Sequence, residues 1–117
     1  MLDLRQQELK EWQIKNFGHK EILPEHLALG MAEEVGEVCH HVLKGVEGIR
    51  GGVDGINKTE VADGIADTII FGIQLFSHLG MDAEVEISKV IDKVLQRNWV
   101  DDPSGENTDK PIQHMSV

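Results

Sequence analysis

Residues 24–44, PEHLALGMAEEVGEVCHHVLK, carry the strongest structural signal in the chain. Their large apolar residues recur at steps of three and four, the spacing of one helix face: Leu27, Met31, Val35, Val38 and Val42. This spacing predicts an amphipathic helix, and Pro24 fits an early helical position. Glu33, Glu34 and Glu37 stand within five positions of one another in the same stretch. Because like charges repel, they form either a solvated face or a site for a cation.

We expect three further helices from the same spacing, over residues 1–17, 57–78 and 82–98. Candidate caps are Asn57 or Thr59 for the third helix and Asp82 for the fourth. The segment 45–57 is rich in glycine and is predicted to be irregular. No stretch shows the sustained alternation of a strand. The predicted fold is therefore all-α, an antiparallel four-helix bundle.

The composition limits the class of protein. The chain has 117 residues, enough for one domain with a single core. Its 21 acidic and 11 basic residues give a formal charge of -10, which argues against binding along a nucleic-acid polymer. No apolar run reaches the roughly 18 residues that span a membrane, and the N-terminus lacks a signal-peptide pattern. The single cysteine, Cys39, predicts a reducing cytoplasmic location and a buried thiol.

Residues 100–117 differ in composition from the rest of the chain. They are polar, contain proline and glycine, and show no periodicity. We therefore expect a helical domain over residues 1–99 and a flexible tail, or an arm that orders on a partner, over residues 100–117.

Carboxylates line one face of two of the predicted helices. On the second helix, Glu34 and Glu37 are three apart and project from one face. On the third helix a similar set is spaced by three and four and falls within a sector of about 60°: Glu60, Asp63 and Asp67. Neighbouring antiparallel helices pack with axes about 8–10 Å apart, so the two sets would come together. A hard divalent cation would relieve their repulsion, and Mg²⁺ prefers carboxylate oxygens.

These motifs carry a resemblance to a known family. The sequence EEVGEV at residues 33–38, followed by EVADGIADTIIF at residues 60–71, resembles the all-α MazG-like nucleotide pyrophosphohydrolases. The similarity continues through LGMDAEVEISKVIDKVLQRNW at residues 79–99 and covers roughly residues 5–99. The family pattern is a Glu-Glu-x-x-Glu helix followed by a helix that bears Glu-x-x-Asp ahead of an apolar stretch.

The resemblance implies a role for each matching residue. Glu34 and Glu37 would be metal ligands, Asp67 would be a third, and Glu33 would orient or deprotonate the attacking water. Three residues before Asp67, where the family has its second Glu, this chain has Gly64. The missing ligand would then come from another acidic residue of the third helix, Asp63 by preference or Glu60 as an additional ligand.

The implied reaction is hydrolysis of a nucleoside triphosphate to the monophosphate and pyrophosphate, with Mg²⁺ or, as a substitute, Mn²⁺. Phosphoryl-type transfer needs positioning and charge neutralisation more than a nucleophilic side chain. We expect phosphate contacts from five basic residues: Lys44, Arg50, Lys89, Lys93 and Arg97. Trp12 is the first candidate for contact with the base, because the first helix borders the site in similar proteins.

Two other readings stay open. The chain could be a helical interaction module without catalysis, in which case it should be indifferent to Mg²⁺. A di-iron carboxylate protein is suggested by the Glu-x-x-His at Glu37 and His40, but such bundles need a second copy of that motif, which residues 58–98 lack. Short helices bury little surface alone, and the resembling families assemble as dimers or tetramers, so we expect a homodimer or homotetramer.

Overall fold

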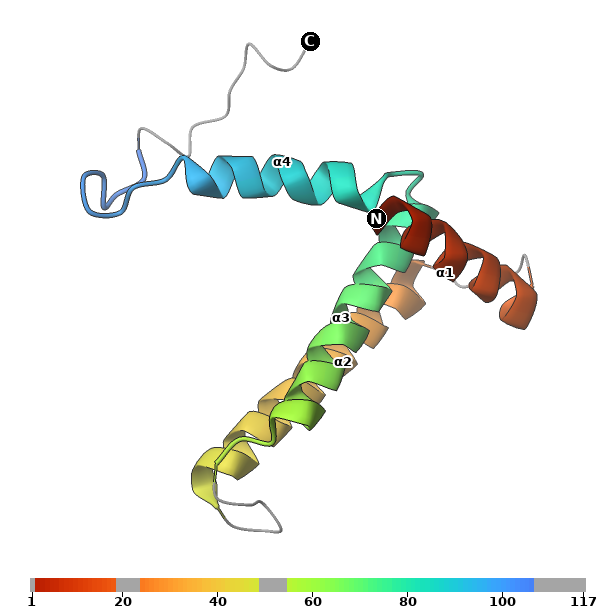
Figure 1. Ribbon diagram of the computed structural model, residues 1–117, viewed down its shortest axis with the longest axis horizontal. Coiled ribbons are helices and arrows are strands. Elements are labelled where there is room, and N and C mark those ends of the chain that lie inside the picture. Colours follow the sequence, from red (N-terminus) through yellow and green to blue (C-terminus); the bar gives the residue numbers. More distant parts are fainter. Residues whose placement is uncertain (1, 19–23, 49–54, 107–117) are drawn as a thin grey trace. The chain divides into compact units, whose positions relative to one another are not determined.

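The part of the chain that the structure describes is helical apart from turns and connections. The structure is a computed structural model, and it describes residues 2–18, 24–48 and 55–106. Four helices follow one another, drawn in Figure 1: α1 (Leu2–Phe17), α2 (Pro24–Glu47), α3 (Lys58–His78) and α4 (Ala83–Leu95). These residues contain no strand, so the predicted all-α class is confirmed.

The helix bounds agree with the predicted ones to within about one residue except at the ends of α2 and α4. Helix α2 continues to Glu47 and not to residue 44, so residues 45–47 of the segment predicted to be irregular are helical; the Gly48 N–H closes this last turn on the Lys44 carbonyl. Asn57 caps α3, since its side chain accepts a hydrogen bond of 3.2 Å from the backbone N–H of Glu60. The fourth helix ends at Leu95 and not near residue 98 as the periodicity predicted. There the Arg97 N–H bonds to the Val94 carbonyl, three residues back, so the chain tightens into a turn. Arg97 therefore lies beyond α4.

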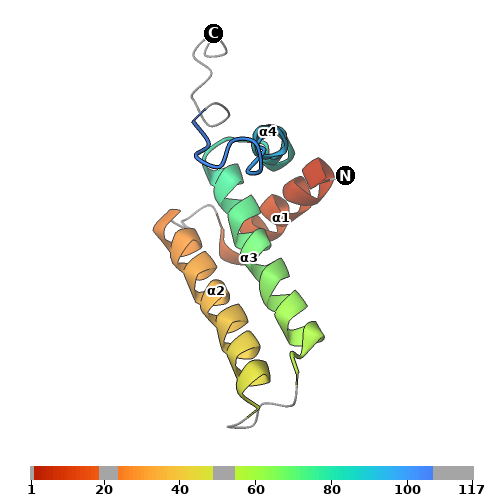
Figure 2. The ribbon, with the colours of Figure 1, turned by 90° about the vertical axis from the view of Figure 1, so that its left-hand side faces the viewer.

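Helices α2 and α3 pack side by side as an antiparallel pair (Figure 2). Glycines on both helices allow close approach. A Cβ atom at Gly30 would lie 2.5 Å from the Phe71 ring, and one at Gly64 would lie 2.7 Å from Cγ2 of Val38. Each helix thus lacks a side chain where the other presents a bulky one. The two backbones can come closer than side chains at both positions would permit.

The buried apolar interior is small. Among the described residues, the buried apolar side chains are Leu27, Ile73 and Ala83. Val35 on α2 and Ile65 and Ile69 on α3 stay exposed. The predicted burial of Cys39 is wrong, because the thiol is exposed on the part of α2 that turns away from α3. A monomer therefore leaves much apolar surface in water.

The chain divides into two units, Met1–Ala83 and Glu84–Val117. In the second unit, Asn98 Oδ1 accepts hydrogen bonds of 3.1 Å from the backbone N–H groups of Val100 and Asp101. The first part of the segment predicted to be a flexible tail, residues 100–106, thus contains hydrogen-bonded turns. The rest of that segment, residues 107–117, lies outside the described residues. No single helix in the described ranges has both the length and the apolarity needed to cross a membrane.

Candidate functional site

Glu34 is the carboxylate of α2 that points most directly at α3. Gly30 and Val38 mark the side of α2 that contacts α3, and Glu34 lies four residues from each of them. A step of four residues turns about 40° round a helix, so Glu34 stands between the two contact points. Glu33 lies about 100° to one side of Glu34 and is exposed. Glu34, which is directed toward α3, and Glu33, which is accessible to solvent, are therefore adjacent in sequence.

The electrostatic consequence appears at Glu34 itself. Its pKa is raised above the ordinary value, first because its surroundings partly exclude water, and then because of the negative charges of Asp67, Glu33 and Glu37. Asp67 belongs to α3, so negative charges from both helices act on Glu34. This arrangement favours a positive charge at Glu34, either a proton or a cation.

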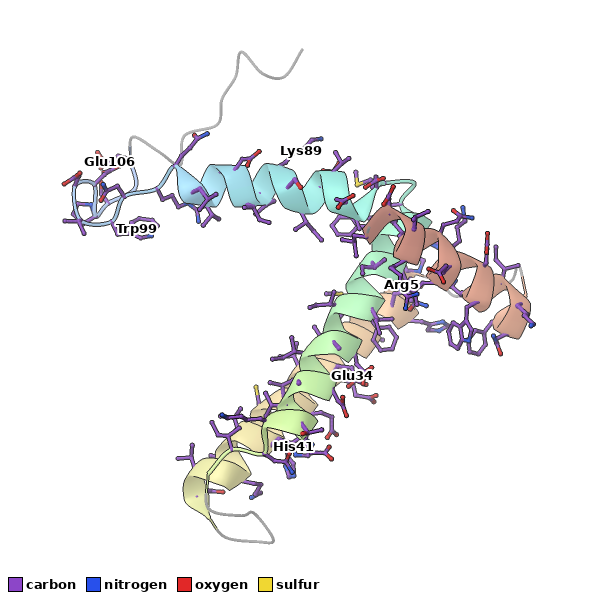
Figure 3. All side chains as sticks on the ribbon, viewed as in Figure 1. Arg5, Glu34, His41, Lys89, Trp99 and Glu106 are labelled. Carbon is purple, nitrogen blue, oxygen red and sulfur yellow. The ribbon has the colours of Figure 1, made fainter. Side chains whose placement is uncertain are left out.

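His41 joins the same group of side chains across the two helices. Its Nε2 atom lies 4.0 Å from a carboxylate oxygen of Glu37 and 3.8 Å from one of Glu60. Figure 3 shows Glu34 and His41 on the same side of the α2–α3 pair. His41 follows Glu37 by four residues and so lies on the same side of α2. We call the six carboxylates of this side the acidic face: Glu33, Glu34, Glu37, Glu60, Asp63 and Asp67.

The geometry of α3 bears on which acidic residue could take the place of the Glu that the MazG-like pattern has where this chain has Gly64. Gly64 points straight at α2, where Val38 fills the space that a side chain would need. Measured round the helix from Gly64, Glu60 is about 40° away, Asp67 about 60° and Asp63 about 100°. Glu60 also reaches His41 of α2. This geometry favours Glu60 over Asp63, the residue that the spacing alone led us to prefer.

The acidic face contains the carboxylate oxygens that a hard metal ion binds, but these oxygens are not grouped closely enough to coordinate one. In the described ranges, no three His, Cys, Asp or Glu side chains are grouped so that they could hold a metal ion. Glu37 and Glu60 have 59% and 54% of their side-chain surface exposed, so both can turn. The oxygens of Glu34, Glu37, Glu60 and Asp67 fit the preference of Mg²⁺ for carboxylates.

The predicted phosphate-binding residues are scattered over the chain. Lys44 belongs to α2, where it pairs with Glu47 at 3.3 Å and keeps only 18% of its side chain exposed. Lys89 pairs with Glu86 of its own helix at 3.4 Å. Lys93 and Arg97 belong, like Lys89, to the second unit, and Arg97 lies 5.9 Å from the centre of the Trp99 ring. Arg50 lies outside the described residues.

A groove of about 400 Å³ lies between α1 and α3. Its lining comes from four residues of α1 and two of α3: Arg5, Glu8, Leu9, Trp12, Ile70 and Ile73. The Trp12 ring meets the Phe17 ring edge to face at 5.8 Å and is 52% exposed, so part of it is open to a ligand. Ile70 follows Asp67 by three residues, a rise of about 4.5 Å along α3. The groove therefore begins about one helical turn from the acidic face.

Two features of this region were not apparent in the sequence. The first is the groove, which depends on how α1 docks. The second is the buried Gln6, whose partners lie more than seventy positions away. A polar residue at one helix position has no local signature that marks it as a long-range contact.

Comparisons of the chain with family models, with curated proteins and with solved structures find no match. The resemblance to the MazG-like enzymes therefore rests on the motifs in the sequence.

Proposed function

We propose that the protein is a Mg²⁺-dependent nucleoside triphosphate pyrophosphohydrolase of the MazG-like type. The observation that carries the proposal is the position of Glu34 on α2, where partial exclusion of water and then the charge of Asp67 on α3 raise the pKa of Glu34. A pair of this kind is strained while both groups are ionised and relaxes when a cation joins them. The order of the motifs, Glu-Glu-x-x-Glu and then a helix with Asp67, supports the same class.

In the proposed site, Glu34, Glu37, Glu60 and Asp67 would hold the metal, with Asp63 as the alternative to Glu60. Bound Mg²⁺ would supply the positive charge that neutralises the triphosphate oxygens and these carboxylates. Glu33, the exposed neighbour of Glu34, would accept the proton of the attacking water. The water oxygen bonds to the α-phosphorus, and the bond from that phosphorus to the bridging oxygen breaks. The products are the nucleoside monophosphate and pyrophosphate.

The groove beside Trp12 would take the base. It offers one aromatic ring and the aliphatic side chains of Leu9 and Ile70, a lining that suits a planar heterocycle. It also begins about one turn along α3 from Asp67. A nucleotide could then place its phosphates at the acidic face and its ring in the groove. Lys44, Arg50, Lys89, Lys93 and Arg97 remain the proposed phosphate contacts.

The test is phosphate release from a panel of ribo- and deoxyribonucleotides with Mg²⁺, with and without added inorganic pyrophosphatase. A signal that requires the added enzyme would identify cleavage between the α and β phosphates, and the panel would identify the substrate. Glu37→Gln is the inactive control, since it keeps the size of a proposed ligand and removes its charge. Orthophosphate released without pyrophosphatase, or no release from any nucleotide, would refute the proposal.

We also propose that the chain assembles as a homodimer or homotetramer through Val35, Ile65 and Ile69, which we call the apolar face. Ile65 and Asp63 lie on opposite sides of Gly64, about 100° to either side, so the apolar face is turned away from the acidic face. Burial of such side chains against a second copy would contribute about 1.5–3 kcal/mol for each fully buried one.

Sedimentation velocity tests this assembly directly. Ile65→Lys should shift the protein toward the monomer, because it would bury a charge in the interface. Val100→Lys is the matched control, since Val100 is 90% exposed and belongs to the second unit. A wild-type protein that sediments as a monomer, or an Ile65→Lys variant that assembles as well as the control, would refute this part of the proposal.

The non-catalytic interaction module is the second candidate. The observation that favours it is the apolar side of α4, where Val90, Ile91 and Leu95 are exposed. Thermal melts with and without millimolar Mg²⁺ and a non-hydrolysable triphosphate separate the two. Mg²⁺ and the triphosphate should raise the melting temperature of an enzyme, and Glu34→Gln should remove that increase. An interaction module should melt at the same temperature with and without these additions. For both candidate functions we propose a cytoplasmic location, because the cytoplasm keeps thiols reduced and the single thiol of the chain, Cys39, is exposed.

A further inference from the structure

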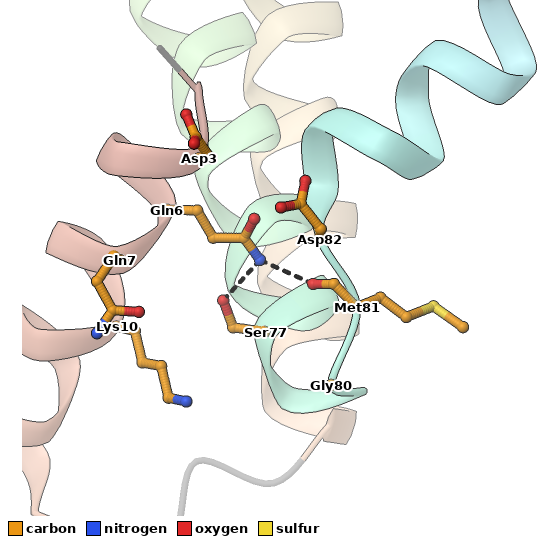
Figure 4. A pocket seen from close by; sticks show the side chains of 8 residues that line it. All are labelled: Asp3, Gln6, Gln7, Lys10, Ser77, Gly80, Met81 and Asp82. Atoms are coloured by element: carbon orange, nitrogen blue, oxygen red, sulfur yellow. Dashed lines mark hydrogen bonds between the residues drawn. The ribbon is translucent and has the colours of Figure 1, made fainter.

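Gln6 of α1 is the polar residue that ties the beginning of the chain to the turn between α3 and α4. Its side chain is buried, with 8% of the residue exposed. Its Nε2 group donates hydrogen bonds of 2.9 Å to the Ser77 hydroxyl and to the Met81 carbonyl. Its Oε1 atom accepts a 2.8 Å bond from the N–H of Ala83, the first residue of α4. Figure 4 shows the Gln6 side chain extending from α1 toward Ser77 and Met81.

These bonds use the amide both as a donor and as an acceptor. Both Nε2 hydrogens have acceptors, and the carbonyl oxygen has a donor. The Met81 carbonyl and the Ala83 N–H are backbone groups of the turn, which is itself fixed by bonds such as Met81 N–H to the Phe76 carbonyl. Gln6 is therefore attached to a rigid part of the unit.

The same helix supplies one wall of the groove. Leu9 and Trp12 stand three and six residues beyond Gln6 and face Ile70 and Ile73 of α3. Because α1 is a continuous helix from Leu2 to Phe17, its axial position at Gln6 fixes the position of these two side chains. A shift or rotation of α1 would change the width of the groove even though the residues that line it stay the same.

We infer that Gln6 is a positioning residue for the α1–α3 groove, acting through Leu9 and Trp12. It holds α1 at the axial position and rotation, relative to α3, that keep the groove open to a planar ring. The inference rests on the proposed function only in treating that ring as the base of a nucleotide. The hydrogen bonds and the groove they support exist without a ligand.

The experiment uses Trp12 as its own reporter. The chain has two tryptophans, so Trp99→Phe leaves Trp12 as the single fluorescent indole. In this background, Gln6→Leu removes all three hydrogen bonds and keeps the side chain roughly the same size. Gln7→Leu is the matched control: Gln7 is the adjacent glutamine, exposed, and bonded at 3.2 Å to Glu11 of its own helix. Ser77→Ala removes one of the three bonds and serves if Gln6→Leu does not fold.

Quenching, nucleotide binding and turnover are expected to separate Gln6→Leu from the control, and tripolyphosphate binding is not. Acrylamide should quench Trp12 more strongly without any ligand, because the groove wall is no longer held. A non-hydrolysable nucleoside triphosphate with Mg²⁺ should bind about tenfold more weakly. Mg²⁺-tripolyphosphate, which has no ring, should bind equally well to both variants. In turnover, KM should rise while kcat stays near the parent value. Ser77→Ala should show the same pattern at about threefold.

Equal quenching of Trp12 in Gln6→Leu and Gln7→Leu would overturn the inference, whatever the ligand does. So would an equal loss of nucleotide and tripolyphosphate binding, because Gln6 would then support the whole unit and not the groove. If the parent protein bound neither ligand, the proposed function would fail, and the quenching comparison alone would decide the role of Gln6.

Discussion

The contact between Gly64 and Val38 can be tested by filling it. Gly64→Ala would place a methyl carbon 2.7 Å from Cγ2 of Val38, far inside the favourable carbon–carbon separation of about 3.5–4.0 Å. Overpacking of this kind costs about 1–3 kcal/mol. Alanine is favoured over glycine in a helix interior by about 1 kcal/mol. We therefore expect the free energy of unfolding to fall by about 1 kcal/mol, within a range of about 0–2.

A second substitution shows whether the clash is the cause. Val38→Ala alone removes two partly buried methyl groups and should cost about 1 kcal/mol. In the double variant, the methyl carbon introduced by Gly64→Ala enters the space that Val38 leaves, so the steric term disappears. We expect the two substitutions to be non-additive by about 1–2 kcal/mol, with the double variant no less stable than the weaker single variant.

Urea unfolding followed by far-UV circular dichroism measures the four proteins. The protein concentration must be the same in all of them, because assembly would make the apparent stability depend on it. A coupling energy below about 0.5 kcal/mol would refute the close contact of α2 and α3 at this point. The same geometry predicts that Gly64→Glu, which introduces the residue of the MazG-like pattern, does not raise the proposed activity, because the side chain would meet Val38 and not the acidic face.

The remaining predictions concern individual side chains. Glu34→Gln should raise the melting temperature at neutral pH, because folding raises the pKa of Glu34. The stability that this group contributes when protonated is complete below its ordinary pKa of 4.5. It is lost as the pH rises through the raised pKa. The gain should vanish in melts below pH 4.5, and a gain that persists there would contradict this cause. Glu60→Gln should weaken Mn²⁺ binding in calorimetric titrations more than Asp63→Asn, and the opposite order would restore Asp63 as the ligand. Asn57→Ala should lower the free energy of unfolding by about 1 kcal/mol through loss of the α3 cap, measured by urea unfolding, and no change would mean that water replaces the cap.

The helices were predictable because their signals are local. The steps of three and four through Leu27 and Val42, and the cap at Asn57, depend only on residues near one another in sequence. The ends of α2 and α4 were less predictable, because the last members of the apolar spacing, Val42 and Val94, do not show how far each helix continues. Helix α2 runs on to Glu47, whereas α4 ends at Leu95 in a tight turn at Arg97. The exposure of Cys39 was missed because spacing cannot tell which part of a helix a partner will cover.

The candidate site was predictable to the level of the helix face. The spacing placed Glu34 and Asp67 on faces that could meet, and the structure brings their charges within range of each other. It did not indicate that Glu60 lies nearer α2 than Asp63, because that depends on where Gly64 points. Gln6 was invisible for a related reason: its partners are set by how α1 docks on α3, and no periodicity records that docking.

The pairing of a glycine on one helix with a large side chain on the other also fixes the register of α2 and α3. Phe71 lies against Gly30 and Val38 against Gly64, so residue numbers rise along one helix as they fall along the other. Sliding either helix by one turn, about 5.4 Å, would put the Phe71 ring against His26 or Glu34 and leave the glycine gap empty. The pair therefore has one steric setting that satisfies both contacts. In that setting Glu34 stays level with Asp67, so these two carboxylates cannot separate by sliding along the helix axes. His41 likewise stays level with Glu60.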